Sequence, residues 1–129
     1  MNIGEAAQES GVSAKMIRYY EETGLVPKPS RTASGYRSYH HSDVHRLRFV
    51  GRARDLGFSM EKISQLLLLW QDRKRPSREV KKLAQLHLDD LQRQIQRLQE
   101  MHNTLQHLVD ACQGNSRPHC PILKDLGAE

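Results

Sequence analysis

The sequence predicts a mostly α-helical protein, and three observations support this fold class. In the first half, short stretches with apolar residues at helical spacing follow one another and are separated by glycines. A stretch with prolines and alternating aromatic residues interrupts them and does not fit a helix. In the second half, apolar residues recur every three or four positions over about 30 residues, which predicts one long helix.

Two short helices are expected at the start of the chain. The first begins near Ile3 and is ended by Gly11. Ser13 is placed to cap the second, which spans residues 14–23. Two short helices joined by a tight turn have the layout of a helix-turn-helix. Its second helix carries Lys15, Arg18, Tyr19 and Tyr20.

The stretch from Val26 to Tyr39 predicts a small hairpin. It holds two prolines, a Ser34-Gly35 turn and alternating polar and aromatic residues, which are signals of strands and turns. Beside a helix-turn-helix, such a hairpin is a wing.

Two further helices complete the first half. Ser42 is expected to cap a helix that ends at Gly57, and Ser59 is expected to cap the next one. The core residues expected from that next helix are Ile63, Leu66, Leu67 and Trp70.

After a polar break, Ser77 stands where the N-cap of a long helix belongs. The helix is about 45 Å long and carries a coiled-coil seam of alternating three- and four-residue spacings. The seam residues are Leu88, Leu91, Ile95, Leu98, His102, Leu105 and Val109. One helix cannot bury this seam alone, so a homodimer is expected. A seam packed within one chain is the alternative, but the sequence offers no second long helix.

The positive charge is concentrated in the first half. The chain has a formal net charge of +5, and residues 15–54 hold 9 Lys or Arg against 3 Asp or Glu. This stretch is a candidate surface for a polyanion, and a solvated charged face is the alternative.

Two cysteines, Cys112 and Cys120, flank a turn-forming segment with Gly114 and Pro118, so their thiols can meet. Thiolates are soft ligands that favour Cu(I) and its heavier relatives, and two of them satisfy a monovalent d10 ion in linear geometry. A zinc site that adds His107 or His119 and a redox-active disulfide are the alternatives.

Membrane and secretory segments are not expected, because the longest apolar run has five residues, Leu66 to Trp70, and the start lacks a signal core. With a mean hydropathy of −0.72, we expect a soluble cytoplasmic protein. An enzyme is not expected, since no carboxylate pair, nucleophile motif or phosphate-binding loop is recognisable. A metal chaperone would share the thiol pair but would not need the basic half or the wing.

Several motifs taken together resemble the MerR family of transcription regulators across essentially the whole chain. They are Ile17-Arg18-Tyr19-Tyr20-Glu21, Gly24-Leu25, Arg31, Gly35-Tyr36-Arg37, Tyr39 and Leu56-Gly57-Phe58. The resemblance is greatest to the copper-efflux (CueR) branch, with the gold-responsive (GolS) type as its sister. It implies a winged helix-turn-helix DNA-binding domain in residues 1–75, an antiparallel dimerisation helix in 77–110, and a metal-binding loop with a short terminal helix in 111–129.

The resemblance also implies roles for individual residues. The expected DNA contacts are Lys15, Arg18, Tyr19, Tyr20, Arg31, Tyr36, Arg37 and Arg54. Arg18 is the best candidate for a bidentate base contact, while the wing residues suit phosphate oxygens. Divalent-metal sensors of the family carry a third cysteine where this chain has Ser77. The expected cofactor is therefore Cu(I), or Ag(I) or Au(I), bound by Cys112 and Cys120 with Ser77 beside the site.

The partners that the resemblance implies are a second copy of the chain, double-stranded promoter DNA and the RNA polymerase on that promoter. The metal-bound dimer is expected to kink and untwist an overlong promoter spacer, and thereby to activate transcription.

Overall fold

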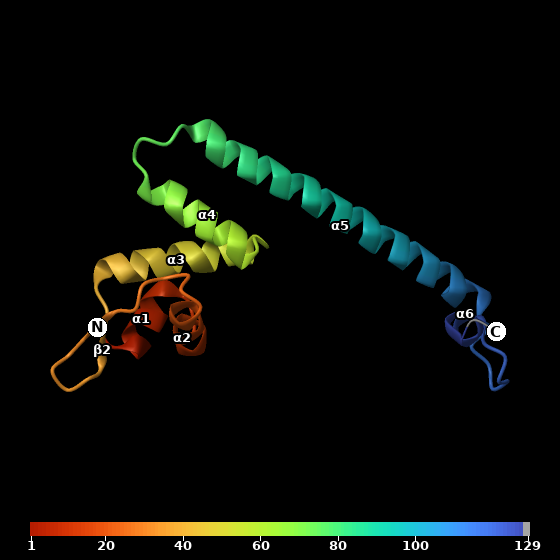
Figure 1. The fold of residues 1–129 in the computed structure, drawn as a ribbon. Coiled ribbons are helices and arrows are strands. Elements are labelled where there is room, and N and C mark those ends of the chain that lie inside the picture. Colours follow the sequence, from red (N-terminus) through yellow and green to blue (C-terminus); the bar gives the residue numbers. More distant parts are fainter. Residues whose placement is uncertain (128–129) are drawn as a thin grey trace. The chain divides into compact units, whose positions relative to one another are not determined.

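The computed structural model describes residues 1–127 and is mostly helical, as predicted (Figure 1). Its elements in chain order are α1 (Ile3–Ser10), α2 (Ala14–Glu22), β1 (Ser30–Arg31), β2 (Arg37–Ser38), α3 (His41–Asp55), α4 (Met60–Gln71), α5 (Ser77–Ala111) and α6 (Pro121–Gly127). The chain divides after Leu83 into two compact units, which are described separately. The expected third segment, 111–129, ends two residues beyond the described part of the chain.

The predicted helix-turn-helix is formed by α1 and α2. The Asn2 side chain accepts a hydrogen bond from the Glu5 backbone N–H at 2.8 Å, and the Glu5 carboxylate accepts one from the Asn2 N–H at 3.1 Å. Gly11 ends α1 with a φ of 77°, a left-handed conformation that glycine adopts without strain. The Ser13 hydroxyl caps α2 as predicted, accepting from the Met16 N–H at 3.2 Å.

The predicted wing is the antiparallel pair β1 and β2. Its register places Ser30 opposite Ser38 and Arg31 opposite Arg37. Gly35 takes a φ of 84° in the connecting turn, which fits the Ser34-Gly35 signal in the sequence.

The predicted cap of α3 was wrong, because Ser42 lies inside the helix and not before it. The helix begins at His41, and the Asp43 carboxylate accepts from the His40 backbone N–H at 2.8 Å. An ionised carboxylate is a stronger acceptor than a hydroxyl, and at the third helical position it reaches back to the first turn. The Ser59 cap of α4 is confirmed, with its hydroxyl 3.2 Å from the Lys62 nitrogen.

One hydrophobic core joins the elements of the first unit, where α3 packs against both α1 and α4 (Figure 1). The largest fully buried side chains are Tyr20, Ile17, Leu47, Ile63 and Val50. Of the residues expected from α4, Ile63 and Leu67 are buried, whereas Leu66 is half-buried. Trp70 is 41% exposed, so its assignment to the core was wrong. Its ring stacks on that of Phe49 in α3, with 4.4 Å between the ring centroids.

The long helix α5 has 35 residues, and none of them is buried in the single chain. It begins at Ser77 itself, so this residue is the first of the helix and not its N-cap. The seam side chains Leu88, Ile95, Leu98, Leu105 and Val109 are between 48% and 62% exposed. Within the described residues, no helix combines the length and apolarity that crossing a membrane requires.

Candidate DNA-binding surface and cysteine loop

The exposed face of α2 carries three of the predicted DNA-contacting residues, Lys15, Arg18 and Tyr19. The opposite face buries Ile17, Tyr20 and Glu21. Because adjacent residues of a helix are about 100° apart, Tyr19 and Tyr20 cannot lie on the same face. The side chain of Tyr19 is 45% exposed, and that of Tyr20 is 2% exposed.

Tyr20 is the fourth residue of α2 that was expected at the DNA groove, and its side chain lies in the hydrophobic core. Its hydroxyl instead accepts a hydrogen bond from Nη1 of Arg54 at 2.8 Å. The Arg54 guanidinium also lies 6.0 Å from the centre of the Tyr20 ring. The hydrogen bond with Tyr20 raises the pKa of Arg54 above its ordinary value. Tyr20 therefore holds a charged residue of α3 against α2.

The wing carries Arg31, Tyr36 and Arg37. Tyr36, beside the turn, is 74% exposed. Arg31 donates from Nη1 to the carbonyl oxygen of Gly35 at 2.7 Å, which ties the guanidinium to its own hairpin. Arg37 donates from Nε to the Glu21 carboxylate at 3.1 Å. The wing arginines are thus oriented by hydrogen bonds rather than extended freely into solvent.

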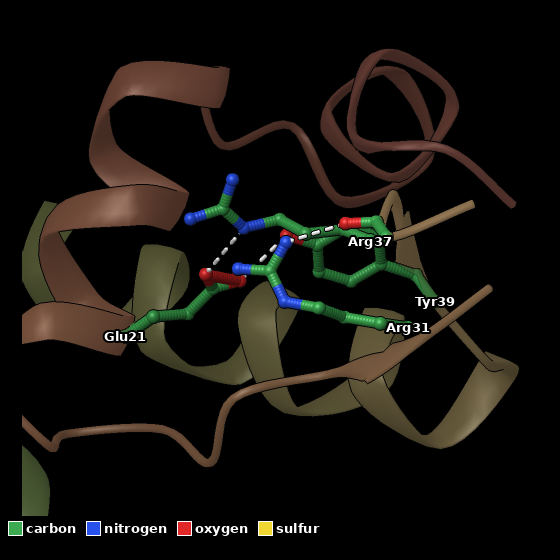
Figure 2. A network of polar contacts seen from close by, with 5 residues as sticks. Glu21, Arg31, Arg37 and Tyr39 are labelled. Carbon is green, nitrogen blue, oxygen red and sulfur yellow. Dashed lines mark hydrogen bonds and ion pairs between the residues drawn. The ribbon is translucent and has the colours of Figure 1, made fainter. Parts of the chain in front are cut away.

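Figure 2 shows the network around Glu21, a residue to which the sequence reasoning assigned no role. Its carboxylate is buried, at 4% exposure, and accepts from Arg37 and from the hydroxyl of Tyr39 at 2.5 Å. Burial and the neighbouring Glu21 raise the pKa of Tyr39 above its ordinary value. A sequence signal did exist, because Glu21 lies four residues after Ile17 on the apolar face of α2. A carboxylate on a core-facing stripe requires partners.

The chemistry of this unit suits a polyanion. Three cationic or hydroxyl groups are exposed on the second helix of a helix-turn-helix, and the wing adds arginines that are held in place. Such groups bind phosphate oxygens, and a planar guanidinium also reads base edges.

In the second unit, the segment between Cys112 and Cys120 folds into a turn. Gly114 has a φ of 63°, and the Asn115 side chain accepts from the Arg117 N–H at 2.9 Å. These features reverse the chain between the end of α5 and the start of α6. Both cysteines are free thiols and are partly buried.

The Cys120 thiol lies directly before α6. The backbone N–H of Leu123 lowers the pKa of this thiol, as do the N–H of Ile122 and a hydrogen bond with the Cys112 side chain, while desolvation opposes them. Among residues 1–127, no three His, Cys, Asp or Glu side chains converge into a metal-holding group.

The two thiols offer soft sulfur ligands. His107 and His119, which the zinc alternative needs, are both exposed. Ser77 is exposed at the start of α5 and offers a hydroxyl, a hard ligand unlike a thiolate.

Comparisons with known proteins agree with the DNA-binding unit. The profile described as "MerR HTH family regulatory protein" matches residues 1–69, and the one described as "MerR, DNA binding" matches residues 44–108. The HTH-type transcriptional regulator HmrR of Sinorhizobium medicae is 56% identical, over 98% of this chain and 86% of the relative. The regulator CueR of Escherichia coli O157:H7 is 38% identical, over 98% of this chain and 93% of the relative.

The fold is also that of a solved regulator. The transcription regulator PbrR691 from Ralstonia metallidurans CH34, in complex with lead(II), matches with a TM-score of 0.83 and 28% identity, covering 98% of both chains. These relatives are transcription regulators, which confirms the prediction that the chain is not an enzyme. The similarity to HmrR exceeds that to CueR. From its helix-turn-helix, its motifs and these matches, we conclude that the chain belongs to the MerR family of transcription regulators.

Proposed function

We propose that the chain is a cytoplasmic, homodimeric transcription activator that responds to Cu(I), or to Ag(I) or Au(I), bound by Cys112 and Cys120. The observation that carries this proposal is the pair of partly buried thiols at the two ends of the cysteine loop, where Gly114 in its left-handed conformation helps to reverse the chain. Two thiolates are a complete ligand set for a linear monovalent d10 ion, whereas structural zinc takes four ligands.

Charge supports a monovalent ion. Two thiolates and one +1 ion carry a net charge of about −1, which needs an electropositive environment. The backbone N–H groups of Ile122 and Leu123 supply it at Cys120. Two thiolates would already neutralise a divalent ion, but such an ion prefers more ligands, and a serine at position 77 adds no third thiolate.

The exposed seam of α5 supports the homodimer. Five large apolar side chains of the seam lie at least 48% exposed along it. A second copy of the helix would cover them by coiled-coil packing, and a two-fold dimer matches a palindromic promoter site.

Replacing Leu98 by Glu should yield monomers in sedimentation equilibrium. Gln99→Glu adds the same charge next to the seam, and it should leave the dimer intact.

Activation would proceed through the shape of the promoter. The dimer occupies its site with or without metal, and the metal-bound form bends and untwists the spacer so that RNA polymerase can engage both promoter elements. Bending such a site costs about 1–6 kcal/mol. Shifting a two-state equilibrium from 1:99 to 99:1 requires about 5.5 kcal/mol of differential affinity, which two thiolate sites per dimer can supply.

Two alternatives concern the signal and not the family. The names of several relatives refer to heavy metals in general, and the lead(II) complex of PbrR691 favours a divalent ion. A zinc response or a reversible disulfide between Cys112 and Cys120 would use the same loop.

One experiment separates these signals. Transcription from the target promoter by purified RNA polymerase is measured anaerobically while Cu(I), Ag(I), Au(I), Zn(II) and Pb(II) are titrated in turn. Activation by a coinage-metal ion, absent when both cysteines are serine, is expected. Activation by Zn(II) or Pb(II) alone would reject the monovalent assignment, and activation by oxidant alone would indicate the disulfide.

A further inference from the structure

We infer that Glu21 is a positioning residue for DNA binding, because its buried carboxylate fixes the wing residue Arg37 beside the helix that reads the DNA. The inference rests on the proposed DNA contact of Arg37 and assigns a role to a residue that contacts no DNA itself.

The geometry joins two elements that are far apart in the sequence. Glu21 lies in the last turn of α2, and Arg37 and Tyr39 lie 16 and 18 positions later, in and just after β2. The carboxylate accepts from Arg37 Nε at 3.1 Å and from the Tyr39 hydroxyl at 2.5 Å (Figure 2). The Glu21 carboxylate therefore links the two-stranded wing to the second helix.

The position is a costly one for a carboxylate. Glu21 is 4% exposed, so its charge is largely removed from water. It also lies at the carboxyl end of α2, where the helix dipole disfavours negative charge. An apolar side chain would fill a buried position without either cost. A role that needs the charge explains why a charged group stands there.

Electrostatics supply that role. The register of the wing places Arg31 directly opposite Arg37, and like charges opposite each other in a strand pair are destabilising. The negative charge of Glu21 offsets this repulsion at Arg37. The positive charges of Arg37 and Arg18 both oppose the rise in the pKa of Tyr39.

The hydrogen bond uses one donor of the guanidinium and leaves others for DNA. Nε carries one of the five N–H groups of arginine, and the four on the Nη nitrogens can bind a phosphate. The Arg37 side chain is 28% exposed, so an outside anion can reach it. A guanidinium held in place loses less conformational freedom on binding than a free one.

The test measures DNA affinity and its dependence on salt. A fluorescent duplex is first obtained by selection from a random-sequence library with the wild-type protein. The affinity of the protein for this duplex is then measured by fluorescence anisotropy at salt concentrations from about 50 to about 300 mM. These measurements define the salt slope, which is the slope of log affinity against log salt concentration. The variants are Glu21→Gln, Arg37→Ala and the double variant. Glu22→Gln is the matched control, since it removes the same charge from the exposed neighbouring position.

If Glu21 positions Arg37, Glu21→Gln weakens DNA binding about tenfold relative to Glu22→Gln. It also reduces the magnitude of the salt slope by about the amount that one phosphate contact contributes. Arg37→Ala has the same two effects, and the double variant is no weaker than Arg37→Ala alone. A purely structural role would instead lower affinity additively and leave the slope unchanged, which would overturn the inference.

Circular dichroism establishes that each variant is folded. Should Glu21→Gln unfold, Glu21→Asp keeps the carboxylate one methylene further back, and it is expected to fold and to bind with an intermediate loss. Unfolding of both variants would overturn the inference, since Glu21 would then serve the fold alone. If the wild type selects no duplex, the proposed DNA contacts themselves are rejected; if it binds and Glu21→Gln matches Glu22→Gln, only the role of Glu21 is rejected.

Discussion

Nη1 of Arg54 donates a hydrogen bond of 2.8 Å to the hydroxyl of Tyr20, across 34 positions of the sequence. The bond connects the end of α3 to the buried face of α2. A residue of the second helix of the helix-turn-helix thus orients a cation on another helix.

Replacing Tyr20 by Phe keeps the buried ring and removes the acceptor for Arg54. We expect DNA affinity to fall about threefold to tenfold, because the guanidinium is no longer held before binding. In an Arg54→Ala background the same replacement should have no further effect. Equal losses in both backgrounds, measured by anisotropy, would show that the hydroxyl acts independently of Arg54.

Arg18 is proposed to read a base edge. Arg18→Ala should weaken binding and relax sequence preference at one position per half-site, with about 1–3 kcal/mol of discrimination lost there. Competition with single-base variants of the selected duplex measures this loss. Uniform weakening across all sequences would assign Arg18 to the phosphate backbone instead.

The proposed division between the two units predicts the behaviour of Cys112→Ser. Metal-driven transcription should be abolished, since one thiolate cannot complete a linear site. DNA affinity without metal should stay within about twofold of the wild type, because the charged contacts that set it are untouched. A large loss of DNA binding would contradict this division.

The lowered pKa of Cys120 predicts how the metal-free protein reacts with iodoacetamide. Only the thiolate reacts, so the midpoint of Cys120 alkylation against pH should lie below the ordinary thiol pKa of about 8.5. Because the pKa of Cys120 is lower in the folded protein than in the unfolded chain, ionisation of this thiol stabilises the folded loop at pH values above the unfolded pKa. This stabilisation is lost as the pH falls through the folded pKa. Leu123→Pro removes the main N–H donor and should raise the midpoint. Leu123→Ala keeps the donor and should not, and a shift of equal size in both variants would reject this cause.

Gly51 allows α3 to approach Val12. A Cβ at this position would lie 2.9 Å from Cγ2 of Val12, a buried and branched side chain with little freedom to move. We expect Gly51→Ala to lower the free energy of unfolding by about 1–3 kcal/mol in urea denaturation. Gly127→Ala, where a Cβ meets open space, should leave it unchanged.

Local signals predicted most of the fold. Capping by Ser13 and Ser59, the turns at Gly11 and Gly35, and the long helix all follow from residues within a few positions of one another. The errors arose where two local signals competed or where packing decided. At α3 the Asp43 carboxylate outcompeted Ser42, and Trp70 stacked on Phe49 at the surface and did not enter the core.

The sequence by itself determined the order of the helices, the basic character of the first unit and the two cysteines around a turn, because periodicity, capping and composition act over short range. It left undecided which of Tyr19 and Tyr20 is buried, and it gave no partner for Glu21. Only the tertiary structure decided these points. A buried charge or hydroxyl takes whichever donor or acceptor the fold brings beside it, and Arg37, Tyr39 and Arg54 lie 16, 18 and 34 positions from the residues they bind.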